Sequence, residues 1–315
     1  MKAIVFESRR RSIGAANARG DAGQSRNQGP ARIGAIGPTL ERGARIIASA
    51  CAAIFMLAGC ATHSAPTASS KQDVRIERLD KEFDIDRDIA RVAIDNPWGE
   101  INVRGRDERE VGIHAVIQRL PPTFPRVKFA SHRVGDTLRI DVVLAGANLA
   151  ADGETPQARV DIAVYVPSDL ALALSTRDAR IAATRRRGAI EATTDSGEIH
   201  ASSLGQLTLK SNTGQIRAIA IGKRWQGASE IATESGRIVL LVPTFGDIAL
   251  DARTHGALTT GFGLSVHSLP NGEHEAHARY GAGTSPLRAR STNGEIVLEQ
   301  LVLLGEDTEL PEDDD

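Results

Sequence analysis

Residues 193–216 read TTDSGEIHASSLGQLTLKSNTGQI, and this stretch decides the fold. It contains polar corners that end in glycine, each followed by a short run of alternating apolar and polar residues. The same unit recurs along the chain, and the glycine spacings between Gly188 and Gly256 are 9, 8, 9, 13, 9, 10 and 10 residues. Glycine permits the positive φ that a tight bend can require. Two such units predict one coil of about 17–22 residues.

These coils are expected to stack, because each exposes an apolar edge that only a neighbouring coil can bury. Ile199 and Ile216 would then point into the core, and the Asn, Ser and Thr side chains of the corners would hydrogen-bond to the coil above or below. A β-sandwich of hairpins is the competing architecture. It favours two-residue Asn-Gly or Asp-Gly turns, whereas these corners mostly read x-Ser-Gly or x-Thr-Gly.

Strands are also predicted before the repeat begins. Alternation with period 2 runs through 101–103, 111–117, 138–142 and 160–166, with turn residues between these runs. The predicted fold class is therefore all-β: a parallel β-solenoid of short coils with an N-terminal β-strand meander, after a signal peptide and a flexible linker.

A second informative stretch is Leu57-Ala58-Gly59-Cys60, which closes an apolar run over 46–56 that Arg42 and Arg45 precede. A basic segment, an apolar segment and a small-residue cleavage site form a secretory signal. With Cys60 after the last small residue, the segment resembles a bacterial lipoprotein signal peptide with its lipobox. The resemblance implies cleavage between Gly59 and Cys60 and lipid on the Cys60 sulfur. A transmembrane helix is the alternative, but a span needs roughly 20 apolar residues.

The repeat resembles the bacterial "putative-adhesin" domain family of unknown function. The residues that carry the resemblance are the segment 96–103, Asn-Pro-Trp-Gly-Glu-Ile-Asn-Val, and the later S/T-x-G-x-I coils, over about 90–300. The resemblance implies an all-β, solenoid-like fold and, from the family name, adhesion.

The expected domain organisation combines these segments. Residues 1–40 are expected to be disordered or to result from a start codon assigned too far upstream, and the lipoprotein signal peptide is expected at 41–59. The lipidated Cys60 and linker at 60–88, the adhesin-like β-solenoid at 89–303 and an acidic disordered tail at 304–315 are expected to follow. The stretch 146–157 is expected as a helical or loop insertion in the solenoid.

Charge and cysteine content exclude several functions. Residues 1–59 hold nine of the 38 Lys and Arg and three of the 40 Asp and Glu, so the mature chain would carry 29 basic and 37 acidic side chains, a net charge near −8. This balance argues against a nucleic-acid partner. Cys51 would lie in the expected signal peptide and Cys60 would carry the lipid that the resemblance implies, which would leave no disulfide and no cysteine metal site. The basic triplet 185–187 is expected at a solvated corner.

Few residues suggest chemistry, since no nucleophile elbow, phosphate loop or H-E-x-x-H motif occurs. His274 and His277 would point to opposite faces of a strand, which argues against a metal site; no cofactor is expected. Glu275 would share one face with His277. Asp251 and Arg253 share a strand face, as catalytic groups do in some solenoid polysaccharide lyases, but a surface ion pair explains them better.

Two tryptophans are the candidates for ligand binding. Trp98 follows Pro97 at a strand entry, where it could stack on a sugar or cap the end of the aliphatic core. Trp225 lies in the longest turn of the repeat, 222–227. This makes it the best candidate for an exposed recognition residue, weighed against a packing role.

The predicted function is that of a non-enzymatic, lipid-anchored envelope protein, an adhesive or scaffolding binding module with a glycan or envelope-protein ligand. A carbohydrate-active, lyase-like solenoid enzyme and an accessory or sensing subunit of an envelope complex are the alternatives. Ala61 follows Cys60 in place of the Asp that resembles an inner-membrane retention signal. The expected location is therefore the outer membrane.

Overall fold

The computed structural model describes residues 74–121, 124–145 and 158–302 as strands joined by turns and short connections. Twenty-one strands form two sheets, sheet A with ten strands and sheet B with eleven. The all-β fold class is therefore confirmed. The expected signal peptide, Cys60, the 146–157 insertion and the tail from 304 onward lie outside the described residues.

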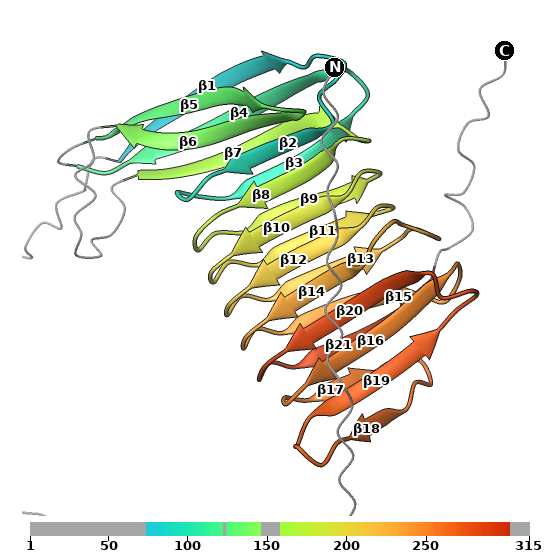
Figure 1. The fold of residues 1–315 in the computed structure, drawn as a ribbon. Coiled ribbons are helices and arrows are strands. Elements are labelled where there is room, and N and C mark those ends of the chain that lie inside the picture. The colour runs from blue at the N-terminus through green and yellow to red at the C-terminus, as the bar shows by residue number, and fades with distance from the viewer. Residues whose placement is uncertain (1–73, 122–123, 146–157, 303–315) are drawn as a thin grey trace, which may run out of the picture. The chain divides into compact units, whose positions relative to one another are not determined.

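The middle of the described unit is a regular stack in which each coil gives one strand to each sheet (Figure 1). Its strands are β8 (Ala171–Ser175), β9 (Ile181–Arg186), β10 (Ile190–Thr194), β11 (Ile199–Ser203), β12 (Leu207–Ser211), β13 (Ile216–Ala220), β14 (Ser229–Thr233) and β15 (Ile238–Pro243). The even-numbered strands pair in parallel in sheet B and the odd-numbered strands in sheet A. The register Ile181–Ile199–Ile216–Ile238 gives coils of 18, 17 and 22 residues, which confirms the predicted coil length.

Alternate residues of these strands point between the two sheets and form the core. Ile190, Ile199, Leu207 and Ile216 each expose 1% or less of their surface, so the inward assignment of Ile199 and Ile216 is confirmed. Full burial of one such side chain stabilises the fold by about 1.5–3 kcal/mol. Fully buried alanines, such as Ala192, alternate with these larger residues and keep the core thin.

The corner glycines are required for close stacking and not for positive φ. At Gly197, Gly214, Gly236 and Gly294 an added Cβ would lie only 1.8–2.0 Å from a backbone carbonyl oxygen of the neighbouring coil. None of these four glycines has a positive φ. The expectation that glycine serves the bend by adopting positive φ is therefore wrong at these corners, because the neighbouring backbone leaves no room for a Cβ.

The hydroxyl three residues before each of these glycines completes the corner. Thr194, Ser211, Thr233 and Ser291 accept a hydrogen bond from the N–H of the following corner glycine at 2.8–3.1 Å. The hydroxyls of Thr194 and Thr233 also donate to carbonyls of the preceding coil, at 2.8 and 3.0 Å. The predicted hydrogen bonds between corners of adjacent coils are thus confirmed.

The N-terminal strands do not join the stack in chain order. They are β1 (Arg75–Asp84), β2 (Arg91–Asp95), β3 (Ile101–Arg106), β4 (Glu110–Arg119), β5 (Arg126–Val134), β6 (Thr137–Ala145) and β7 (Ala158–Pro167). The β2–β3 coil lies between the β6–β7 coil and the β8–β9 coil, and all three pair in parallel. Only β5 and β6 are antiparallel neighbours in chain order, so a simple meander describes that pair alone.

Strand β1 lies within the segment 60–88 that was expected to be a linker. It pairs antiparallel with β4, which itself pairs antiparallel with β7. Its apolar residues Ile76, Leu79 and Phe83 are spaced by three and four positions, so the period-2 signal of a strand is missing. Pairing with β4 overrides this local pattern, as sheet contacts often do.

The C-terminal end also contains a coil that is out of order. Its strands are β16 (Ile248–Thr254), β17 (Leu258–Thr260), β18 (Val266–Ser268), β19 (His274–Arg279), β20 (Ser285–Ser291) and β21 (Ile296–Leu301). The β20–β21 coil inserts between the β14–β15 coil and the β16–β17 coil, as Figure 1 shows. After β15 ends at Pro243, the chain therefore bypasses the next coil position and fills it about 40 residues later, from Ser285 onward.

Arg186 fixes the crossover from β7 to β8, where the chain passes over the β2–β3 coil. Its guanidinium donates to the carbonyls of Val166 (2.9 Å), Pro167 (2.5 Å) and Leu170 (3.2 Å). The residue is 1% exposed. Burial lowers the pKa of Arg186 to about 10, so the group stays charged at neutral pH.

The buried position of Arg186 corrects the expectation of a solvated basic corner. Arg185 has a φ of +56°, and the register between β9 and β11 shifts at this point. The bulge moves the inward position from Arg185 to Arg186, since an extra residue reverses the alternation of faces. Arg185 and Arg187 are exposed, as expected.

Candidate functional site

The structure places Trp225 in the core, which contradicts its candidate role as an exposed recognition residue and bears out the packing role that was weighed against it. The residue is 7% exposed. Its backbone N–H donates to Ser285 Oγ (3.2 Å), and its indole N–H donates to the carbonyl of Pro286 (3.3 Å). Both partners begin β20, the strand that returns to pair with β14. The long turn therefore packs against the inserted coil.

The charged residues noted on β16 and β19 form an ion-pair network on the outer face of sheet B. Arg253 contacts Asp251 at 3.2 Å and Glu275 at 3.6 Å, and Glu275 contacts His277 at 3.2 Å. His274 lies on the opposite face, as its spacing from His277 predicts. These charges are matched to one another, which supports the surface ion-pair interpretation of Asp251 and Arg253.

Neither a metal cluster nor a membrane-spanning helix is present in the part of the chain that the structure describes. No group of three His, Cys, Asp or Glu side chains there is placed to hold a metal ion. Within the same ranges, no helix is long and apolar enough to cross a membrane.

Trp98 stands in a corner that is equivalent to the regular glycine corners. Ile101, Ile181 and Ile199 are paired in register. Each lies two positions after the last residue of its corner, which is Gly99, Ala179 or Gly197. Trp98 therefore takes the place that Asp178 and Ser196 take in the next two coils. A large aromatic side chain replaces a small polar one at this level of the stack.

The residues around Trp98 hold its corner in one conformation. Asn96 is fully buried, donates to the carbonyl of Val160 at 2.8 Å, and accepts from the Trp98 backbone N–H at 3.4 Å. At Gly99 an added Cβ would lie 2.2 Å from the same Val160 oxygen, so only glycine fits there. The indole N–H donates to the carbonyl of Val142 at 3.2 Å, which fixes the ring while it stays partly exposed.

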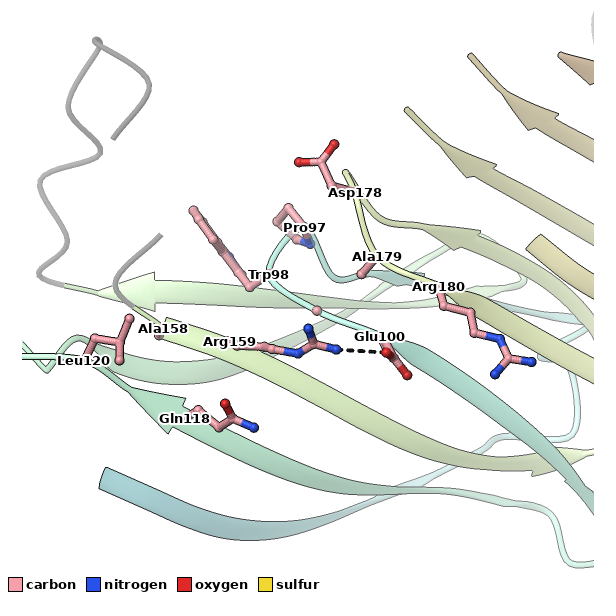
Figure 2. Close-up of a pocket in the computed structure, with 11 residues that line it drawn as sticks. Pro97, Trp98, Glu100, Gln118, Leu120, Ala158, Arg159, Asp178, Ala179 and Arg180 are labelled. Atoms are coloured by element: carbon pink, nitrogen blue, oxygen red, sulfur yellow. Dashed lines mark hydrogen bonds and ion pairs between the residues drawn. The ribbon is translucent and has the colours of Figure 1, made fainter. Parts of the chain in front are cut away.

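A groove of about 360 Å³ lies beside Trp98 (Figure 2). Four segments line it: the corner 97–100, Gln118 and Leu120 at the end of β4, Ala158 and Arg159 at the start of β7, and the corner 178–180. They are far apart in sequence, and the out-of-order N-terminal coils bring them together.

An ion pair forms the charged part of this groove. Figure 2 shows the Arg159 guanidinium joined to the Glu100 carboxylate, at 2.8 Å. Arg159 Nε also donates to Asp161 at 2.9 Å, and the Glu100 backbone N–H donates to Asp161 at 2.9 Å. The hydrogen bond and charge of Asp161, together with Glu100, raise the pKa of Arg159. The Asp161 contacts fix the orientation of both groove residues.

The neighbouring corner supplies the opposite wall. Asp178 accepts a hydrogen bond from Ser196 Oγ at 2.9 Å, and Arg180 Nε lies 3.8 Å from Glu198. The Arg177 guanidinium carbon lies 5.9 Å from the centroid of the Trp98 ring, within the range of a cation–π contact. The groove thus combines one fixed aromatic ring with fixed donors and acceptors.

Sequence reasoning identified Trp98 but missed its polar neighbours. Glu100, Arg159 and Arg180 are ordinary charged residues on strand faces or corners, with no motif spacing between them. Their proximity depends on the position of the β6–β7 coil next to the β2–β3 coil. Glu100 alone carried a local signal, since it lies two positions after Trp98.

Comparison with known proteins identifies little similarity. No protein-family model matches the chain, and no curated protein matches it. One similar solved structure is described as "a putative cell adhesion protein" from Clostridium sporogenes, with 10% sequence identity and a TM-score of 0.40 over 71% of this chain and 100% of that chain. This similarity is distant, so the proposals below rest on the groove and on the sequence.

Proposed function

We propose that this protein is a non-enzymatic binding module of the bacterial envelope, anchored by lipid at Cys60 and adhesive or scaffolding in role. The observation that carries the proposal is the groove beside Trp98. Ligand sites are concave and combine apolar surface with a few fixed polar groups, and this groove has both.

The groove is built for binding without rearrangement. Its aromatic ring, its ion pair and its neighbouring corner are each tied to backbone or side-chain partners on the stacked strands. Short corners between stacked strands are held more accurately than long loops, because rigid elements fix both of their ends. A ligand would therefore lose little affinity to ordering of the protein on association.

Binding at the groove is tested by adhesion of the full-length chain to isolated envelope material, with Trp98→Ala compared with the parent. We expect loss of retention for Trp98→Ala and unchanged retention for Glu275→Gln, a matched charge-removing control in the ion-pair network. Equal retention of parent and Trp98→Ala would contradict the proposal. Degradation of an envelope polysaccharide that Glu100→Gln abolishes would favour the enzymatic alternative.

Anchoring is tested separately at Cys60. A diacylglycerol and an amide-linked chain together give stable membrane attachment, whereas one chain alone binds only reversibly. We expect Cys60→Ser to remain an unprocessed precursor and to be absent from the outer-membrane fraction. Maturation and fractionation like the parent would contradict the lipobox interpretation.

A further inference from the structure

We infer that the groove beside Trp98 binds an uncharged saccharide unit of the envelope. This inference rests on the proposed binding function and names its ligand class. Three features of the groove carry it: the fixed indole ring, the paired charges beneath the ring, and the balance of charge along the lining.

The indole ring offers a flat apolar surface next to polar groups. Pro97 and Leu120 extend this apolar surface within the groove. A pyranose ring has C–H faces that pack on an aromatic plane, and hydroxyl groups at its rim. The hydrogen bond from the Trp98 indole to Val142 (3.2 Å) prevents the ring from turning away.

The polar groups are suited to hydroxyls, which donate and accept at once. Glu100 supplies carboxylate acceptors and Arg159 supplies donors, and the two groups lie side by side at 2.8 Å. Gln118 adds an amide with a donor and an acceptor at the same groove. Neighbouring hydroxyls of one sugar could therefore bridge an acceptor and a donor.

The charges of the lining favour a neutral ligand over an anionic one. Glu100 and Asp178 balance Arg159 and Arg180 in formal charge. Arg159 already contacts two carboxylates, Glu100 and Asp161, at 2.8 and 2.9 Å. To reach the Arg159 guanidinium, an anionic sugar would have to displace one of them. The volume of about 360 Å³ is near the lower end of the range for ligand pockets, which suits one or two sugar units.

The test is a glycan array followed by titration calorimetry with the full-length chain. Its arms are N-acetylglucosamine oligosaccharides, which are the uncharged component of peptidoglycan glycan strands, neutral hexose oligosaccharides, anionic oligosaccharides and unrelated extended peptides. We expect binding in one of the two neutral arms, and the arm that binds identifies the source of the sugar. Affinity should change little between low and high salt, because no net charge is neutralised.

The variants are Trp98→Ala, Trp98→Phe and Gln118→Ala, each checked for parental circular dichroism. We expect Trp98→Ala to weaken neutral-sugar binding at least about tenfold, with a smaller loss for Trp98→Phe, which keeps an aromatic face. Gln118→Ala removes a polar group from the groove without removing the ring and should also weaken binding. It therefore tests the groove even if Trp98→Ala does not fold. Glu275→Gln is the unchanged control.

Three results would overturn the inference. Binding confined to anionic glycans with strong salt dependence, or to peptides, would reject the neutral sugar while leaving a Trp98-dependent binding module in place. Binding of neutral sugars that neither Trp98→Ala nor Gln118→Ala weakens would reject the groove as the site. If no arm binds and Trp98→Ala does not alter envelope retention, the proposed function fails as well.

Discussion

The regular coils from β8 to β15 and the N-terminal β2–β3 coil use the same corner in different ways. In three of the regular coils the corner consists of a Ser or Thr, two polar residues and a glycine, at 194–197, 211–214 and 233–236, whereas the β8–β9 corner has Thr176 and ends in Ala179. In the β2–β3 coil, Asn96 replaces the hydroxyl residue and Trp98 occupies one of the small polar positions. Gly99 is kept because the next backbone is equally close, 2.2 Å from an added Cβ.

The comparison separates scaffold from site. Stacking imposes the capping side chain at each of these levels and a glycine wherever the next backbone comes as close as it does at Gly99, Gly197, Gly214 and Gly236, so those positions are fixed by the architecture. The residue just before the glycine faces outward and is free to change. Trp98 shows how one substitution at such a position, next to an out-of-order coil, creates a groove on a repetitive surface.

The largest expected effect comes from a substitution that disrupts a regular corner. Gly214→Ala places a Cβ 1.9 Å from the carbonyl oxygen of Gly197, so the backbones must separate. We expect a loss of about 3 kcal/mol or more in the free energy of unfolding. The control is Gly135→Ala in the β5–β6 turn, where φ is +63° and nothing lies within 4 Å. It should cost about 1–2 kcal/mol from φ alone. Urea denaturation measures both, and equal losses would contradict the account.

The second prediction concerns the crossover that places the out-of-order N-terminal coil. Arg186→Met removes three hydrogen bonds to buried carbonyls. We expect a loss of about 2–3 kcal/mol in the free energy of unfolding. Leaving buried carbonyls without a hydrogen-bond donor destabilises the fold more than removing the buried charge stabilises it. Arg187→Met, one residue away and exposed, is the matched control and should change stability by less than about 0.5 kcal/mol. Similar melting of the two variants would remove Arg186 from this role.

The third prediction separates the capping hydroxyl from the glycine. Thr233→Val keeps the side-chain shape but loses the bond to the carbonyl of Asn212 and the bond from the N–H of Gly236, both 3.0 Å. We expect a loss of about 1–2 kcal/mol in the free energy of unfolding. Thr208→Val, on the outer face of β12, should be nearly neutral. If the two variants unfold at the same denaturant concentration, the Ser and Thr hydroxyls before the corner glycines do not stabilise the corners.

The smallest effect is a pH dependence from His200 on β11. Burial, then the charges of Arg180 and Arg217, lower the pKa of His200 below its usual value. The unfolded chain therefore binds a proton at higher pH than the folded chain, and the free energy of unfolding falls as pH falls from about 7 to 5. His200→Gln should lose less stability over this range than the parent. His267→Gln serves as the control, and an identical pH dependence for parent and His200→Gln would refute the prediction.

The central coils could be predicted from sequence because their information is local. Glycine spacing, alternation and corner composition all lie within one or two units of the repeat. The physical role of the glycine was nevertheless misassigned, since close approach between coils is visible only when the coils are stacked. Arg186 was misplaced for a related reason, because one bulge reverses the inward and outward positions.

The ends and the site depended on contacts between distant segments. The spacing through Gly246 and Gly256 continues the repeat, yet the β20–β21 coil separates this unit from β15. That insertion buries Trp225, although its position in a long turn predicts an exposed side chain. At the other end, the groove exists because β6 and β7 stack beside β2 and β3. Only Trp98, preceded by Pro97, marked that place in the sequence.

The most direct test of this account is amide hydrogen exchange of the full-length chain with and without neutral envelope oligosaccharides. The account predicts that exchange slows in the segments that line the groove, 97–100, 118–120, 158–159 and 178–180, while β10 to β15 are unchanged. Protection spread along the regular coils, or protection that persists in Trp98→Ala, would contradict the division into a scaffold of repeated corners and a ligand site at the Trp98 corner.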